Sequence, residues 1–109
     1  MATVDLARLT KNEVSMLTGH ERGVQARALF SLDSLDVQDD VVRIVAPTNL
    51  DTITPSFVQG FLARSISQLG RDRLFTKYDF STLPAALRED FVTGIERLAM
   101  HARRSAAVH

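Results

Sequence analysis

The chain has 109 residues, 45% of them hydrophobic and 24% charged, and its thirteen basic residues balance thirteen acidic ones. This length and composition predict one globular domain around one core. A formal charge of zero argues against non-specific nucleic-acid binding, which needs an excess of Lys and Arg. The absence of cysteine excludes a disulfide framework, an iron–sulfur cluster and a thiolate nucleophile. We expect a cytoplasmic protein, because no signal-peptide pattern is present and no apolar run approaches ~20 residues.

The first third of the sequence carries weak patterns. Val4, Leu6 and Leu9 predict a short strand over residues 3–9. Residues 10–13 (Thr-Lys-Asn-Glu) read as a capping box that opens a short turn. A helix is predicted over residues 20–32, and the polar stretch 33–40 is predicted to be a loop. The expected buried face of that helix consists of Val24, Ala28, Leu29 and Leu32.

The middle of the chain has the strongest local signals. Residues 41–46 are almost continuously apolar, which predicts a central strand covered on both faces. Residues 47–54 form a turn-rich loop at its carboxyl end, and a helix follows from Pro55 to Leu69. Thr54 suits the N-cap, Pro55 the first helical position and Gly70 the C-cap. The apolar stripe of this helix consists of Phe57, Val58, Phe61, Leu62, Ile66 and Leu69.

Two further elements complete the chain. Alternation over residues 74–80 predicts a third strand, and Pro84 introduces a last helix. The stripe of that helix consists of Leu87, Phe91, Ile95, Leu98 and Ala102, and residues 103–109 are expected to be a flexible tail. Alternating strands and helices predict an α/β domain spanning residues 1–109, with a mainly parallel sheet of three to four strands and packing helices.

Polar residues gather where the central strand ends and the helix at Pro55 begins. In open α/β sheets, ligands bind outside the carboxyl ends of the strands. Free backbone N–H groups at a helix start attract anions. The candidate contact residues for a partner or an anion are Asp51, Thr52, Thr54, Ser56 and Gln59, with Arg64 at the rim. Thr54 and Ser56 are also candidate phosphorylation sites, with Ser56 favoured because the Thr54 hydroxyl is needed for capping.

The segment from Val42 to Leu69 resembles the STAS-like family of unknown function. These bacterial and phage-associated domains are related to the STAS domains of anti-sigma-factor antagonists and sulphate transporters. The shared features are an apolar strand, a short loop, the opening Ile-Thr-Pro-Ser-Phe at residues 53–57, and an apolar helix ended by Leu69-Gly70. Residues 19–27 resemble the family's upstream helix start, although His20 stands where a basic residue is expected. The resemblance covers most of residues 15–80.

The resemblance implies a regulatory protein-binding module of STAS-like fold. In the antagonists, a partner kinase phosphorylates a Ser or Thr at the helix start. By position, the acceptor here is Thr54 or Ser56, with Thr-Pro-Ser-Phe standing where the antagonists have Asp-Ser-Ser-Gly. The implied partner is a protein, in particular a kinase-like ATPase. We expect no catalysis, no cofactor, no metal, no nucleic acid and no membrane partner.

Two other functions fit the same residues. A small α/β domain or enzyme could bind an anion or a nucleotide at the helix start. A self-associating protein could use its neutral charge and an uncovered edge strand to form a homodimer.

Overall fold

A computed structural model describes residues 1–11 and 13–107, with side chains described through residue 101. Eleven elements follow one another in this part of the chain. In order they are β1 (Ala2–Asp5), α1 (Ala7–Thr10), β2 (Met16–Leu17), α2 (His20–Leu29), α3 (Leu32–Asp36), β3 (Val42–Val45), β4 (Thr52–Ile53), α4 (Pro55–Leu69), α5 (Arg71–Lys77), β5 (Tyr78–Asp79) and α6 (Ala85–Ala107).

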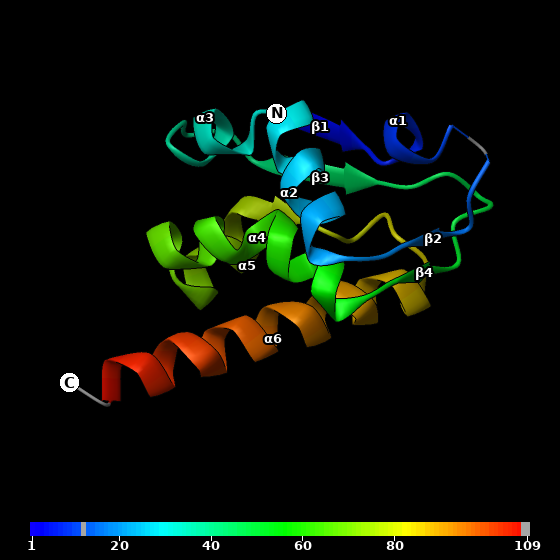
Figure 1. Ribbon diagram of the computed structural model, residues 1–109. Helices are drawn as coiled ribbons and strands as arrows, with labels where there is room; N and C mark the ends of the chain where they lie inside the picture. The colour runs from blue at the N-terminus through cyan, green and yellow to red at the C-terminus, as the bar shows by residue number, and fades with distance from the viewer. Residues whose placement is uncertain (12, 108–109) are drawn as a thin grey trace.

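The strands form two parallel sheets. A three-stranded sheet has the order β1-β3-β5, and a separate two-stranded ribbon joins β2 to β4. Val4 of β1 lies opposite Ile44 of β3, and Val42 lies opposite Tyr78 of β5. In Figure 1, β1 and β3 run along the top, α6 runs along the bottom and α4 lies between them. The predicted α/β class with a mainly parallel sheet is confirmed, as is the central place of β3.

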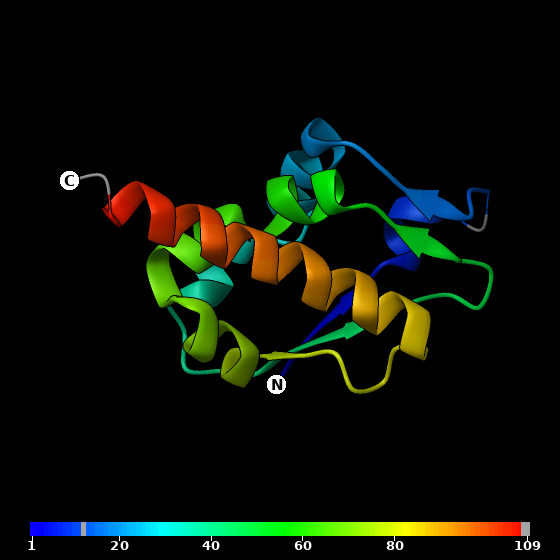
Figure 2. The ribbon, with the colours of Figure 1, turned by 90° about the horizontal axis from the view of Figure 1, so that it is seen from below.

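The core lies between the sheet and the helices. Phe61 of α4 stands 6.3 Å from Phe91 of α6, and Phe91 stacks on Phe80 at 4.8 Å between ring centroids. Figure 2 shows α6 crossing the molecule in front of the sheet. The predicted apolar stripe of α4 is buried apart from the half-buried Leu69, and α6 buries Leu87, Phe91, Ile95 and Leu98. Both stripes therefore point into one core.

The sheet has one covered face and one open face, which corrects the expectation for residues 41–46. Val42 and Ile44 are fully buried, whereas Arg43 and Val45 are only half-buried. Thr3 lies beside Arg43 on the open face, and Arg43 pairs with Asp79 at 3.4 Å. No helix of the described residues needs to cover this face, because its side chains are mostly polar.

The first third of the chain differs most from the prediction. The first strand ends at Asp5, and Leu9 belongs to α1. The capping box at residues 10–13 is wrong: Thr10 ends α1, and the Glu13 N–H donates to the Thr10 carbonyl at 2.8 Å in a turn. Asn12 lies outside the described residues. The predicted helix over residues 20–32 ends at Leu29, and α3 occupies part of the predicted loop 33–40.

The predicted buried face of the helix over residues 20–32 is wrong except at Leu32, which is buried but belongs to α3. Val24 and Leu29 are nearly half exposed, and the helix instead buries Gly23, Ala26 and Arg27. Small residues allow α2 to lie directly against α4, so its packing face carries no large apolar stripe to detect.

The third predicted strand over residues 74–80 is wrong for most of its length. Residues 71–77 form α5, and only Tyr78 and Asp79 pair with β3. Gly70 caps α4 as predicted, with φ +82°, and α5 starts at the next residue. The last helix continues to Ala107, beyond the point at which the tail was predicted to begin. Residues 108–109 of that tail lie outside the described residues.

Candidate functional site

The start of α4 has the local geometry that the sequence predicts. Thr54 is extended (φ −81°, ψ 156°) and occupies the N-cap, and Pro55 is the first helical residue. The Thr54 hydroxyl accepts a hydrogen bond from the Phe57 N–H at 3.3 Å. This bond satisfies one of the backbone donors that every helix start leaves unpaired.

Ser56 links this start to the start of α2. Its exposed hydroxyl accepts a hydrogen bond from the Gly19 N–H at 3.2 Å and lies 3.0 Å from the Thr54 hydroxyl. Gly19 is the N-cap of α2. The Ser56 hydroxyl therefore stands between two helix starts that are 37 residues apart in sequence.

Helices α2 and α4 run side by side in the same direction. Gly19 meets Ser56 near their first turns, and Arg27 meets Ser65 further along both helices. Their backbones touch at Gly23 and Gly60, where neither residue has room for a side chain. Each helix carries partial positive charge at its N-terminus. Because Gly19 at the start of α2 contacts Ser56 at the start of α4, both of these charges lie near Ser56.

The other predicted contact residues are not all gathered at this point. The Asp51 N–H donates to the Ser15 carbonyl at 2.8 Å, and Thr52 pairs in register with Met16. Asp51 therefore lies at the far end of the β2–β4 ribbon from α4. Gln59 is exposed on α4 and lines a hollow of 240 Å³ with Arg97, Met100 and His101.

A carboxylate that the sequence analysis missed fixes the strand before the site. Asp90 of α6 accepts a hydrogen bond from the Ile53 N–H at 3.0 Å. A single carboxylate on a helix surface carries no sequence signal for such a contact. It ties β4 to α6, and it therefore helps to hold the start of α4 in place.

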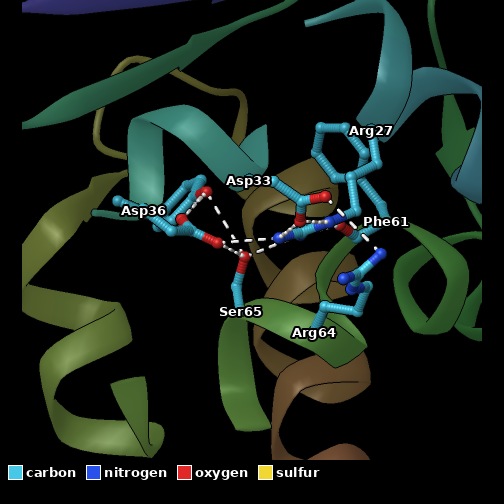
Figure 3. Close-up of polar contacts among 7 residues, drawn as sticks. Arg27, Asp33, Asp36, Phe61, Arg64 and Ser65 are labelled. Atoms are coloured by element: carbon cyan, nitrogen blue, oxygen red, sulfur yellow. Dashed lines mark hydrogen bonds and ion pairs between the residues drawn. The ribbon is translucent and has the colours of Figure 1, made fainter. Parts of the chain in front are cut away.

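A buried polar network also escaped the sequence analysis (Figure 3). The Arg27 guanidinium donates to Asp36 at 2.8 Å, to the Ser65 hydroxyl at 2.8 Å and to the Phe61 carbonyl at 3.0 Å. Ser65 and Tyr78 also donate to the Asp36 carboxylate, the latter at 2.5 Å. Arg27, Asp36, Ser65 and Tyr78 are each at most 4% exposed.

The network joins four elements rather than forming a reaction site. It connects α2, α3, α4 and β5, and among the described residues no buried side-chain nitrogen or oxygen lacks a partner. Hydrogen bonds from Arg27 hold the pKa of Asp33 at its exposed edge below the ordinary value. Burial, helped by the bond to Asp36, raises the pKa of Tyr78 well above its ordinary value. Since the buried side chains of the network all have hydrogen-bond partners, the network positions α2 and α4.

Arg64, the predicted rim residue, lies outside this network on the surface of α4. Its guanidinium stands 3.5 Å from the Asp33 carboxylate, and both side chains are more than half exposed. Such surface pairs contribute little stability. Arg64 is therefore free to contact a partner on the exposed face of α4.

Comparison of the chain with protein families, with characterised proteins and with solved structures found no match in any of the three. In residues 1–11 and 13–107, no helix has both the length and the apolar character that crossing a membrane requires. Within the same residues, no three His, Asp or Glu side chains gather in a way that could hold a metal ion.

Proposed function

We propose that this chain is a regulatory protein-binding module of the STAS-like kind, whose contact surface is centred on the paired starts of α2 and α4. The observation that supports the proposal is the exposed Ser56 hydroxyl between those two starts. The module acts by binding its partner and carries out no catalysis itself. Gln59 and Arg64 are further exposed residues of α4, and both are available to a partner.

Phosphorylation of Ser56 would switch this surface. A phosphoryl group adds about −1.5 to −2 charge at neutral pH. Two helix N-termini adjoin the hydroxyl, so the fold itself tolerates the new charge. The main effect then falls on the docked partner, through repulsion and desolvation. The proposed setting is the cytoplasm, where a kinase-like partner would have ATP.

The test compares Ser56→Asp with a matched control on the same helix. Ser67 is also an exposed serine of α4, but it lies near the other end of that helix. The wild type, Ser56→Asp and Ser67→Asp are each affinity-purified from the native host, and quantitative mass spectrometry identifies the partner. Calorimetry then measures the dissociation constant of each of the three proteins for that partner. We expect Ser56→Asp to weaken binding by about tenfold or more and Ser67→Asp to leave it nearly unchanged. Equal dissociation constants for all three proteins would show that Ser56 is not part of the interface.

A second candidate function, anion binding, is supported by the two helix N-termini that meet beside Ser56. A ligand that binds only the folded protein raises its apparent melting temperature. A thermal-shift screen of phosphate, sulphate and nucleotides on the full chain should then show a rise that Ser56→Asp abolishes. A flat response to every anion counts against this candidate and leaves the protein-binding proposal standing.

Self-association is a third candidate, supported by the position of β1 at the edge of its sheet. A free strand edge offers unpaired backbone groups to a second copy. Light scattering at several concentrations distinguishes a homodimer from a monomer, and an unchanging monomer mass excludes this candidate.

A further inference from the structure

A groove of 490 Å³ lies between α1, the residues after it, and α2. This volume is within the range of ligand-binding pockets, about 300–1,000 Å³. The groove is separate from the start of α4, because its lining residues come only from positions 8–29. It therefore provides a second surface, and the inference below does not depend on the proposed function.

The floor of the groove is apolar and partly uncovered. The floor is defined as the apolar part of the lining, Leu9, Val14, Ala26 and Leu29. Val14 is 42% exposed and Leu29 is 45% exposed. Covering such side chains with apolar groups is favourable, since each exposed apolar area is then removed from water.

The rim of the groove is basic. Arg8, Lys11 and Arg22 line it, with Glu13 as the single carboxylate, which leaves a local charge of +2 in a chain of zero net charge. None of the three cations forms an ion pair with a described carboxylate. The rim is therefore an uncompensated positive region.

Two of these cations are held in place by uncharged groups. Arg22 donates to the Leu9 carbonyl at 2.7 Å, and the Arg8 guanidinium lies 5.3 Å from the centre of the Phe30 ring. Both contacts fix the position of the guanidinium without neutralising it, and each leaves further N–H donors for a ligand. Anchored guanidinium groups lose less freedom when they bind carboxylates than mobile ones would.

We propose that this groove binds an acidic, amphipathic segment of a partner protein. Apolar side chains of the segment would cover Leu9, Val14 and Leu29, and its carboxylates would pair with Arg8, Lys11 and Arg22. Charge complementarity selects this occupant, because a positive rim favours an acidic partner and repels a basic one. A peptide supplies apolar and acidic groups along one chain, as the two kinds of lining require.

The test is selection of random peptides of about 14 residues, or four helical turns, displayed on phage and panned on the full chain. Selected peptides are then synthesised, and fluorescence anisotropy measures their dissociation constants for the wild type and three variants. Lys11→Glu reverses a rim charge, Val14→Ser removes an apolar group from the floor, and Arg73→Glu makes the same charge change as Lys11→Glu on α5, outside the groove. Thermal melts confirm that each variant is folded.

We expect the enriched peptides to be acidic and rich in apolar residues. Lys11→Glu and Val14→Ser should each raise the dissociation constant by about fivefold, and Arg73→Glu should change it less than twofold. Binding by acidic peptides should also weaken as salt concentration rises. Three results would each overturn the proposal. They are enrichment of neutral or basic peptides, no enrichment at all, and acidic peptides whose binding is unaffected by both Lys11→Glu and Val14→Ser.

Discussion

Gly23 of α2 and Gly60 of α4 lie where the two helices approach too closely for a Cβ atom at either position. A Cβ atom on Gly23 would lie 2.2 Å from the Phe57 carbonyl oxygen, and one on Gly60 would lie 2.0 Å from the His20 carbonyl oxygen. Both contacts are with backbone atoms, which cannot turn aside as a side chain can. The start of α2 is thereby fixed beside the start of α4, where Ser56 lies.

Gly60→Ala should destabilise the fold strongly, although alanine is the better helix former. Alanine gains about 1 kcal/mol in helix propensity over glycine. The clash with the His20 carbonyl outweighs this gain, since overpacking costs about 1–3 kcal/mol or more. We expect a net loss of at least about 2 kcal/mol in urea unfolding, which is the upper end of that cost less the gain in propensity. Ser67→Ala, an exposed substitution on the same helix, should change stability by only a few tenths of a kcal/mol.

Gly94→Ala should behave differently, because its added methyl group meets a side chain. A Cβ on Gly94 of α6 would lie 2.6 Å from two atoms of the Val58 side chain. Combining it with Val58→Ala should therefore recover part of the stability that Gly94→Ala loses. No side-chain truncation should rescue Gly60→Ala in the same way. Similar rescue at both positions would contradict the backbone contact between α2 and α4.

The buried pair of Arg27 and Asp36 should depend strongly on both members. Asp36→Ala removes the buried one of the two carboxylates that pair with Arg27, and it also leaves the Ser65 and Tyr78 hydroxyls without their acceptor. We expect a loss of about 3–5 kcal/mol in chemical unfolding. Replacing both residues, by Arg27→Met with Asp36→Leu, should cost less than Asp36→Ala alone. Asp33→Asn is the matched control, since Asp33 is 58% exposed and contacts the same guanidinium. If Asp33→Asn lost as much stability as Asp36→Ala, burial of the carboxylate would not explain why Asp36 matters more than Asp33.

The sequence predicts both bounds of α4, whereas for α2 it predicts the start but neither the end nor the packing face, because the two helices pack by different means. The cap, the proline, the apolar stripe and the closing glycine of α4 are all local signals. The packing face of α2 consists of Gly23, Ala26 and Arg27, and its partners in α4 lie more than 30 residues away. Hydrophobic periodicity cannot detect a face made of small and charged residues.

The same limit applies to the short strands and to parts of the candidate site. Strands β2, β4 and β5 have two residues each, too few for an alternating pattern to be recognised. The sequence brings Thr54 and Ser56 together correctly, because both belong to one helix start. It could not find Gly19, Asp90 or the buried Asp36, since each makes contacts with elements that are distant in the sequence.

Thr54 should contribute more to the stability of the fold than Ser56 does. Thr54→Ala removes the N-cap acceptor of the Phe57 N–H, and we expect a loss of about 1 kcal/mol in thermal or urea unfolding. Thr54→Ser keeps the hydroxyl and should lose only part of that stability. Ser56→Ala should cost less than Thr54→Ala, because Ser56 is exposed and water can replace it as the acceptor for Gly19. A larger loss for Ser56→Ala would mean that its main role is structural.

Stability should fall in acid partly through Asp79. Hydrogen bonds from Ser81, reinforced by Arg43, hold the pKa of Asp79 below its ordinary value of 3.8. Because the folded-state pKa is the lower one, the contribution is present above the unfolded pKa and is lost as pH falls through the folded value. Asp79→Asn should therefore flatten the decline in melting temperature below about pH 4. An unchanged acid profile in this variant would show that other carboxylates carry the decline.

Stability should also fall in alkali, through Tyr78. Burial and the bond to Asp36 raise the pKa of Tyr78, so the phenol stays protonated in the folded state when it ionises in the unfolded chain, at about pH 10. Stability is then complete below that pH and declines as pH rises above it. Tyr78 is the single tyrosine and the chain has no tryptophan, so tyrosinate absorbance reports this residue alone. In the wild type, we expect tyrosinate to appear together with the loss of helical circular dichroism. The Tyr78→Phe variant should be less stable at neutral pH, but its stability should decline less steeply above pH 10. Tyrosinate that appears near pH 10 while the helices are intact would show that the phenol is open to solvent and that the network does not enclose it.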